Sequence, residues 1–480
     1  MLFNSYEFIF LYIPIVFIMY FALAKYFGKR SAIFWLVITS FFFYGYWDWH
    51  YVALLFLSIC FNYTIGTRII KSVSSGYWLS FGIVGNLLIL GYFKYAAFFL
   101  ENINLLLGSD TFVVPNIILP LGISFFTFTQ TAYLIDAYRG EVKDTSFLVY
   151  CEFVTIFPHL IAGPIINHKD MIPQFTKSQN FVMNYKNIAM GLTLFSIGLF
   201  KKQVIADKLS PWVGKAFENV DSLSFIEAWI GAISYTFQLY FDFSGYSEMA
   251  IGLGLMFNLK FPMNFDSPYK STSIIEFWRK WHMTLGLWVK NYLYIPLGGN
   301  RRGEIRKNIN LFVSMLLIGL WHGAGWTFVL WGGMHGIFLV INHWWRKLNI
   351  NLPKFINWLL TFGCVVVAWV FFRAENFNDA FALLRSMTDV YNIALPANGS
   401  YEKNLGFLVN YGVDFITWKL PTQSIGTLIL MGIVLTIMKN PVKYIESFQP
   451  NWKWFIVTAI LILCAIYELN TYTEFLYCQF

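Results

Sequence analysis

The sequence predicts an all-α fold, a polytopic bundle of helices embedded in a membrane. Of the 480 residues, 57% are hydrophobic and only 12% are charged, whereas about a quarter of the residues of a soluble protein are charged. Long apolar runs recur along the whole chain, and no linker, low-complexity tract or tandem repeat separates them. We therefore expect a single membrane domain that covers residues 1–480.

Each helical crossing of a bilayer core about 30 Å thick needs roughly 20 apolar residues. On this basis we expect about eleven crossings, accompanied by re-entrant or amphipathic helices. The prolines in 112–135 and 148–166 would break or kink a straight helix, so these two runs are candidates for tilted or re-entrant pieces. The candidate runs are 6–25, 31–47, 51–70, 77–99, 112–135, 148–166, 187–205, 226–257, 309–343, 355–372, 424–438 and 453–469.

The basic residues predict which loops face the cytoplasm. Three Lys or Arg residues lie at positions 25–30 after the first run, the next loop at 46–50 has none, and Arg68 and Lys71 follow the third run. Because Lys and Arg are enriched in cytoplasmic loops, we expect the first and third loops inside and the N-terminus outside. The first run is longer than the apolar region of a typical signal peptide and lacks a small-residue cleavage site, so we expect it to be retained in the mature protein.

Most of the excess positive charge lies in one segment. The whole chain has a net charge of +8, and residues 258–308 alone contain nine basic and three acidic residues, a net of +6. Charge confined in this way indicates cytoplasmic topology and attraction to anionic headgroups, and it argues against a nucleic-acid partner. The alternative is that some of these cations bind an anionic acyl donor.

The same basic segment also carries a regular series of large apolar residues. Phe277, Trp281, Leu285 and Trp288 are spaced by four, four and three residues, which places them on one face of a helix. We expect one amphipathic helix that lies in the interface or dips into the bundle and stops by Pro296.

Several common chemistries are excluded by missing motifs. The chain has no GxSxG elbow, no phosphate-binding loop and no HExxH pair. The cysteines are scattered, without CxxC or a metal-ligand spacing, so we expect inert apolar side chains and no metal site. They are Cys60, Cys151, Cys364, Cys464 and Cys478.

His322 is the first candidate for chemistry inside the membrane. It lies in SMLLIGLWHGAGWTFVLWGGMHG (314–336), a run without Asp, Glu, Lys or Arg. A titratable side chain at membrane depth is costly and indicates function. The structural alternative is a histidine that hydrogen-bonds across helices, with Gly323, Ala324 and Gly325 permitting close packing.

His282 is the second candidate, in FWRKWHMTL (277–285) and close to Arg279. Histidine is the side chain best suited to accept and return a proton near neutral pH. The alternative is an ordinary basic and aromatic interfacial helix. His335 is a weaker candidate, and His343, next to an interfacial belt of Trp, Arg and Lys, is expected to be structural.

Two carboxylates interrupt the apolar run QLYFDFSGYSEMAIGLG (238–254). Asp242 and Glu248 at membrane depth need ionic partners or water. They either line a polar cavity, or Asp242 pairs with a buried cation such as Arg279. We favour the pairing, with a role in shaping the interior rather than in proton transfer.

Five blocks in order resemble the membrane-bound O-acyltransferase family. The chain most resembles the bacterial polysaccharide-acetylation branch, typified by the alginate O-acetylation membrane subunit, and is also similar to the D-alanyl transfer protein of teichoic acids. Its ending FLYCQF (475–480) resembles the aromatic-Gln-Phe ending of that branch, with Cys478 in place of an aromatic residue. The blocks are FPHLIAGPI (157–165), YFDFSGYSEMAIGLG (240–254), FWRKWHMTLGLWVKNYLYIPLGGNRRG (277–303), LWHGAGWTFVLWGGMHG (320–336) and WVFFRAENF (369–377).

The resemblance implies a bundle with re-entrant helices, a thin centre and a tunnel where donor and acceptor meet. It implies that His322 is the near-invariant histidine of the family and acts as general base on the accepting hydroxyl. His282, at the second polar position, assists or positions the thioester. The side chains expected to contact substrate or line the tunnel are Asp242, Ser244, Trp278, Arg279, Trp281, Tyr292, Trp321 and Trp326.

The implied activity is O-acyl transfer across the cytoplasmic (inner) membrane of a bacterium. The acyl group, acetyl in this branch, comes from cytoplasmic acetyl-CoA or another acyl thioester, and no bound cofactor is implied. The product is an O-acetylated envelope polysaccharide such as alginate or peptidoglycan, reached through a serine of a secreted or membrane-anchored SGNH-type acetyltransferase partner. The remaining alternative is a transporter of an acyl group or small solute, whose histidines relay protons.

Overall fold

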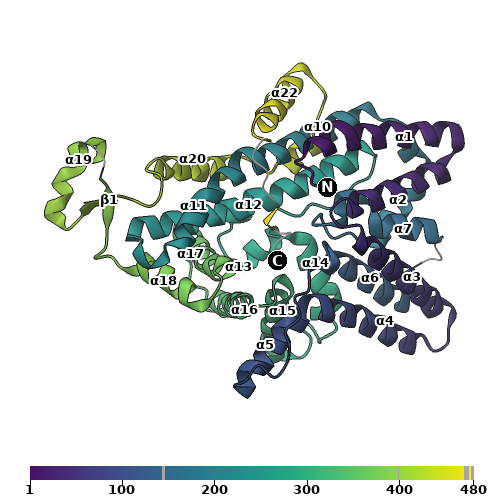
Figure 1. Cartoon of the computed structure of the whole chain (residues 1–480), viewed down its shortest axis with the longest axis horizontal. Helices are drawn as coiled ribbons and strands as arrows, with labels where there is room; N and C mark the ends of the chain where they lie inside the picture. Colours follow the sequence, from purple (N-terminus) through teal and green to yellow (C-terminus); the bar gives the residue numbers. More distant parts are fainter. Residues whose placement is uncertain (143–145, 398, 470–474, 477–480) are drawn as a thin grey trace.

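A computed structural model gives the structure of the chain, and it describes all residues except 143–145, 398, 470–474 and 477–480 (Figure 1). The described residues are mostly helical, with two short strands, so the predicted all-α class is confirmed. The N-terminal part contains η1 (Glu7–Tyr12), α1 (Ile13–Phe27), α2 (Lys29–Gly45), α3 (His50–Lys71), α4 (Ser75–Leu90), η2 (Gly91–Tyr95), α5 (Ala96–Leu107), α6 (Ile123–Tyr138), α7 (Phe147–Thr155), α8 (Phe157–Leu160), α9 (His168–Thr176) and η3 (Ser178–Phe181).

The central part of the chain forms the interior of the bundle and the segment around the candidate histidines. It contains α10 (Tyr185–Phe200), η4 (Lys201–Ala206), α11 (Asp207–Glu218), η5 (Val220–Ser222), α12 (Phe225–Met256), η6 (Pro268–Lys270), α13 (Ile274–Lys280), α14 (Met283–Val289), η7 (Lys290–Tyr294), α15 (Gly303–His322), α16 (Trp326–Lys347), α17 (Lys354–Arg373) and α18 (Phe377–Thr388).

The C-terminal part begins with a small projecting lobe, in which β1 and β2 pair in parallel, and ends with apolar helices (Figure 1). Of the terminal motif 475–480, only Phe475 and Leu476 lie within the described residues. The elements are β1 (Ala394–Pro396), α19 (Gly399–Leu405), η8 (Gly406–Tyr411), β2 (Asp414–Ile416), α20 (Ser424–Ile437), α21 (Pro441–Glu446) and α22 (Trp452–Tyr467).

The long helix α12 is the central element of the bundle. It runs through the middle of the molecule beside α10. In Figure 1, α1 to α4, α6 and α7 gather on the right, α17 and α18 lie on the left, and α5 lies at the bottom beside α15. All of its residues from 234 to 255 are buried. Its 32 residues extend about 48 Å at 1.5 Å per residue, so it exceeds a hydrocarbon core about 30 Å thick.

Glycines set the close contact between α10 and α12. A Cβ atom on Gly191 would lie 2.4 Å from the carbonyl oxygen of Gly252, and one on Gly198 would lie 2.4 Å from that of Gly245. Any side chain at these positions would push the helices apart. Small residues permit the close backbone approach that stabilises helix pairs in membranes.

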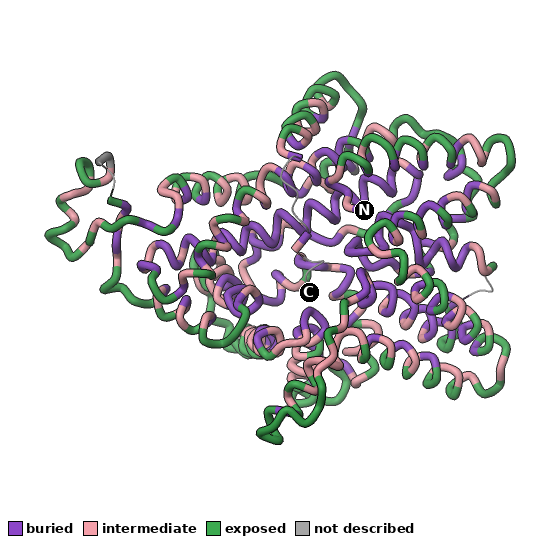
Figure 2. The backbone as a smooth tube through the Cα atoms, viewed as in Figure 1, coloured by how far each residue is buried: buried purple, intermediate pink, exposed green. Residues whose placement is uncertain are grey.

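The surface agrees with a lipid environment. Figure 2 shows burial concentrated along the central helices and exposure on the outer faces of the peripheral ones. Among the described residues, five helical segments are long and apolar enough to cross a membrane, and α20 and α22 are shorter apolar helices. The polytopic membrane fold is thereby confirmed, while the number of about eleven crossings stays a prediction. The five segments are Glu7–Phe27, His50–Lys71, Ser75–Leu107, Tyr185–Glu218 and Lys354–Arg373.

Two predicted continuous helices are broken in the structure. The run 309–343 forms two antiparallel helices, α15 and α16, because Gly323 and Gly325 adopt extended backbone conformations. The small residues after His322 therefore make a turn. Gly323 also permits close packing, because an added Cβ would lie 2.3 Å from the ring of Phe328. The helices themselves approach at Gly319 and Gly332, where an added Cβ would lie 2.2 Å and 2.3 Å from carbonyl oxygens of the facing helix.

The predicted amphipathic helix over 277–288 is also divided, into α13 and α14. His282 lies at the break with φ +44°, a left-handed conformation that is uncommon for a residue with a Cβ. The other sequence expectations for breaks hold. Helix α6 begins at Ile123, after the prolines of its run, and α7 ends at Thr155, before Pro158.

Candidate active site

His322 is the last residue of α15 and is buried among aromatic rings. Its ring centroid lies 4.9 Å from that of Trp321, 5.1 Å from that of Trp331 and 5.2 Å from that of Phe372. These rings come from α15, α16 and α17. The imidazole of His322 therefore lies among aromatic rings from α15, α16 and α17.

His282 is held by side-chain hydrogen bonds at the break between α13 and α14. Its Nδ1 lies 3.0 Å from Oδ1 of Asn264, and the same oxygen accepts from the hydroxyl of Thr284 at 2.8 Å and from its backbone N–H at 3.4 Å. Because that oxygen acts as an acceptor, we infer that Nδ1 of His282 carries the proton and Nε2 is the basic nitrogen. The left-handed backbone adds strain of the kind found at functional sites.

Trp321 brings the two candidate histidines together. The centroid of its ring is 6.4 Å from the ring of His282 and 4.9 Å from the ring of His322. Phe243 of α12 also packs against His282, with ring centroids 4.8 Å apart. Two imidazoles from separate sequence blocks thus face one indole in an apolar environment.

A third histidine, His335, is closer to this group than its sequence context suggested. It is buried, its Nδ1 accepts a hydrogen bond from Nε1–H of Trp278 at 3.2 Å, and its ring lies 4.9 Å from that of Trp331. Trp331 therefore packs against both His322 and His335. The signal in the sequence is the four-residue spacing of Trp331 and His335, which places them on one helix face.

The expected pairing of Asp242 with Arg279 is wrong. Asp242 pairs with Lys202 at 2.7 Å, and Lys202 also contacts Asp207 at 2.8 Å. Lys201 pairs with Glu248. The π-helical turn η4 carries both lysines against α12, and this contact is not visible in the local sequence pattern. Asp242 is thus in an ion pair with a buried cation, as the favoured interpretation required, but with a different partner, and Glu248 is in an ion pair as well.

The remaining predicted site residues fall in several places. Ser244 lies beside the same ion pairs, 3.5 Å from Nζ of Lys201. Trp281 packs among other aromatic rings, including Trp369 at 5.0 Å. The hydroxyl of Tyr292 donates to Asp136 at 2.7 Å. Trp326 is 55% exposed and donates to Asn102, so it is not brought to the histidines.

Trp278 and Arg279 line a cavity of about 690 Å³ that is mainly apolar. Arg279 also borders a second cavity of about 470 Å³, which is lined by Arg346, Glu276 and several amide side chains. The guanidinium of Arg279 thus borders both an apolar cavity and a polar one that contains a second guanidinium.

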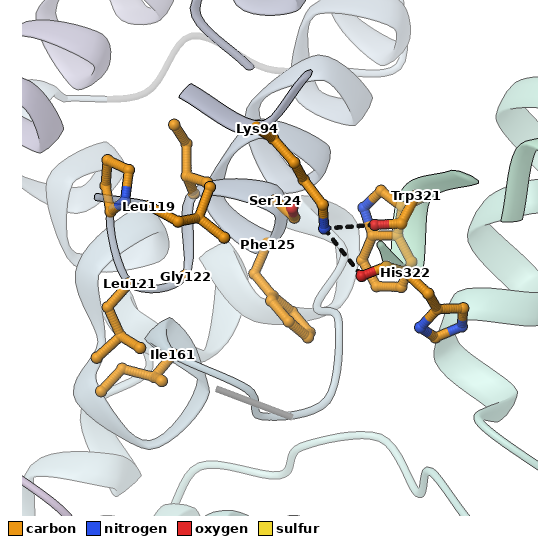
Figure 3. A pocket seen from close by; sticks show the side chains of 11 residues that line it. Lys94, Leu119, Leu121, Gly122, Ser124, Phe125, Ile161, Trp321 and His322 are labelled. Carbon is orange, nitrogen blue, oxygen red and sulfur yellow. Dashed lines mark hydrogen bonds between the residues drawn. The ribbon is translucent and has the colours of Figure 1, made fainter. Parts of the chain in front are cut away.

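A third cavity adjoins the end of α15, on the side away from the imidazole of His322 (Figure 3). Lys94 borders it and donates to the carbonyl oxygens of Trp321 at 2.6 Å and His322 at 3.1 Å. The sequence analysis did not select Lys94. The available signal was a lysine inside the apolar run 77–99, since charge at membrane depth indicates function.

Comparison with known proteins decides the family. The model of "MBOAT, membrane-bound O-acyltransferase family" matches residues 41–378. The chain belongs to this family. The matched range includes His282, His322 and all the aromatic residues that surround them.

The names of several relatives of this membrane-bound O-acyltransferase describe enzymes that modify cell-envelope polymers. The chain is 43% identical to the peptidoglycan O-acetyltransferase of Helicobacter pylori, over 94% of this chain and 92% of the relative. It is 43% identical to the probable alginate O-acetylase of Pseudomonas aeruginosa, over 81% and 75%. It is 28% identical to the teichoic acid D-alanyltransferase of Streptococcus thermophilus, over 52% and 68%.

The resemblance found in the sequence is thereby confirmed, and the chain is a multi-pass membrane O-acyltransferase. The structure adds that both predicted catalytic histidines are buried and contact Trp321. Among the described residues, no group of three or more His, Cys, Asp or Glu side chains is arranged to hold a metal ion.

Proposed function

We propose that the chain transfers an acetyl group from a cytoplasmic thioester to a hydroxyl acceptor on the far side of the bacterial inner membrane. The final product is an O-acetylated envelope polysaccharide, peptidoglycan or alginate in type. The names of the two relatives at 43% identity support the acetyl group and the polysaccharide. The single structural observation that carries the proposal is the pair of buried histidines around Trp321.

In this mechanism His322 is the general base. It removes the proton from the acceptor hydroxyl as the oxygen attacks the thioester carbonyl. The carbon–sulfur bond then breaks, the ester forms, and the thiol leaves with a proton returned by His322. An apolar environment favours the neutral imidazole, which is the form able to accept a proton. His282, held by Asn264, orients the thioester or assists the transfer.

The donor proposed is acetyl-CoA. Arg279 lies between the apolar cavity of about 690 Å³ and the polar cavity of about 470 Å³ that Arg346 also lines. An acyl thioester on a phosphorylated nucleotide needs both environments, an apolar one for the acyl arm and a cationic one for the phosphates. Guanidinium groups bind phosphate by charge-assisted hydrogen bonds. The net positive charge of 258–308 supports the same assignment.

The direct acceptor proposed is a serine of a secreted or membrane-anchored SGNH-type acetyltransferase, which passes the acetyl group to the polysaccharide. With this acceptor, the membrane enzyme needs to admit only a serine side chain from the far side of the membrane, and not a polysaccharide chain. The lipid bilayer is the second partner, contacted by the exposed apolar faces.

The test is transfer from radiolabelled acetyl-CoA by the purified chain in proteoliposomes, with and without the partner acetyltransferase. The proposal expects a base-labile ester on the partner and loss of that label when His322 is replaced by Ala. Passage of acetyl groups without ester formation would instead support the transporter alternative. Labelling from an acyl carrier protein and not from acetyl-CoA would overturn the donor assignment.

A further inference from the structure

Lys94 is a lysine inside a membrane span with an unusual set of partners. It lies in the π-helical turn η2, within the span Ser75–Leu107. Among the described residues, no Asp or Glu forms an ion pair with it. Its ammonium group instead donates to the carbonyl oxygens of Trp321 at 2.6 Å and His322 at 3.1 Å (Figure 3). A charge at this depth is costly and requires an explanation.

The partners are the carbonyl groups at the end of α15. The last four carbonyls of a helix have no partner within the helix, and α15 ends at His322, where the chain turns into extended backbone at Gly323. Next to Lys94, the hydroxyl of Tyr95 donates to the carbonyl of Leu320 at 3.0 Å. Two adjacent residues of η2 therefore satisfy the carbonyls of three consecutive residues, 320 to 322.

The charge of Lys94 suits this position. The carboxyl end of a helix is the negative end of its dipole, so a cation there is stabilising, and a hydrogen bond from a charged donor is stronger than a neutral one. The ammonium also lies 5.9 Å from the centroid of the Trp321 ring, a cation–π contact. One side chain thus restrains both the backbone and the indole beside the two histidines.

Lys94 does not act by touching the imidazole. Figure 3 shows the side chain of His322 pointing away from Lys94 and from the cavity that Lys94 borders. The contact is with the backbone of the residue whose side chain performs the proposed chemistry. π-Helical turns such as η2 occur frequently at functional sites.

We propose that Lys94 is a positioning residue, which fixes the last turn of α15 and thereby aims the imidazole of His322. This inference rests on the proposed function of His322 as general base. Misplacement of a catalytic group by about 1 Å costs on the order of 10²-fold in rate, so the loss of the Lys94 contacts is expected to appear in kcat.

The test uses the full chain in proteoliposomes with radiolabelled acetyl-CoA. We expect Lys94→Met to lower kcat by about 10- to 100-fold, with the KM for acetyl-CoA unchanged. Lys94→Arg, which keeps the charge and the donors, is expected to restore most of kcat. The matched control is Asn310→Ala, which removes a buried hydrogen bond of 3.0 Å to Gly299 at the other end of α15. It is expected to lower the melting temperature and leave kcat per folded molecule unchanged.

The positioning role is overturned if Lys94→Met keeps the wild-type kcat, or if its loss matches the loss of folded protein as in Asn310→Ala. A raised KM without a change in kcat, or no recovery in a well-folded Lys94→Arg, would also overturn it. His322→Ala separates this failure from a failure of the proposed function. Full activity of His322→Ala refutes the general base, whereas inactive His322→Ala beside active Lys94→Met refutes only the positioning role.

Discussion

Two buried polar regions of this enzyme are built in opposite ways. Between η4 and α12, Lys202 lies between Asp242 and Asp207, and Lys201 pairs with Glu248. Around Trp321, the histidines pack against aromatic rings, and the partner of His282 is the neutral amide of Asn264. Both regions lie beside the same central helix α12.

The difference indicates that the ion-pair region stabilises the fold and that the histidine region carries the proposed chemistry. A charge buried with its counter-charge is stabilised in one protonation state, and breaking the pair leaves an uncompensated charge. An imidazole among aromatic rings is neutral and can accept a proton when a hydroxyl arrives. We therefore expect substitutions in the ion-pair region to change stability and substitutions in the histidine region to change rate.

The largest effect is expected from His322→Ala. Loss of a general base lowers the rate of acetyl transfer by about 10²–10⁴-fold, while the protein still inserts and elutes as a single species. Initial rates with radiolabelled acetyl-CoA measure this. His50→Ala, which removes an exposed histidine paired with Asp48, is the control and is expected to retain activity. Near wild-type transfer by monodisperse His322→Ala protein would make the histidine structural.

The opposite behaviour is expected from Asp242→Asn. Leaving a buried charge without a partner costs about 3–5 kcal/mol. Lys202 keeps Asp207 as a partner, so the loss of stability should lie below that range, and the yield and the melting temperature should fall. The molecules that remain folded should transfer acetyl at nearly the normal rate. Thermal unfolding in detergent and the rate per folded molecule measure the two effects. A stable but inactive Asp242→Asn protein would place Asp242 in the reaction and remove the distinction between the regions.

An intermediate loss is expected from His282→Asn. Asparagine tolerates a left-handed backbone better than most residues and can hydrogen-bond, yet it cannot take up a proton near neutral pH. If His282 only orients the thioester, the rate should fall by less than about 10²-fold. A loss as large as that of His322→Ala would instead show that both histidines transfer protons.

A smaller effect, confined to the donor, is expected from Arg279→Ala. A hydrogen bond to a charged group contributes about 1.5–3 kcal/mol, so the KM for acetyl-CoA should rise by about tenfold or more with little change in melting temperature. Lys443→Ala is the control, because Lys443 pairs with Asp266 at 2.7 Å and lines neither cavity. An unchanged KM in a normally expressed Arg279→Ala protein would remove Arg279 from the donor site.

No loss of activity is expected from Asp48→Cys, which tests orientation. The loop at 46–50 has no basic residue and is predicted to face outward. In a background without the native cysteines, of which Cys464 is exposed, a membrane-impermeant thiol reagent should label position 48 from outside. Labelling only from the cytoplasmic side would reverse the topology and exchange the donor and acceptor faces.

Much of the fold could be predicted from composition and local pattern. The apolar runs predicted the membrane helices because a bilayer imposes a minimum length on each crossing. The prolines of 112–135 and 148–166 predicted the breaks before α6 and after α7. His282 and His322 stood out because a titratable side chain is rare at membrane depth, and five ordered motifs identified the family.

Contacts between distant segments could be decided only by the tertiary structure. The 320–336 block gives no local sign of whether its glycines pack two helices or separate them. The even spacing of Phe277, Trp281, Leu285 and Trp288 equally hides the break at His282. Asp242 pairs with Lys202 and not with Arg279 because η4 packs against α12. Lys94 reaches His322 across 228 residues of sequence, and only the packing of η2 against α15 brings them together, since local periodicity describes a helix face and not its neighbour.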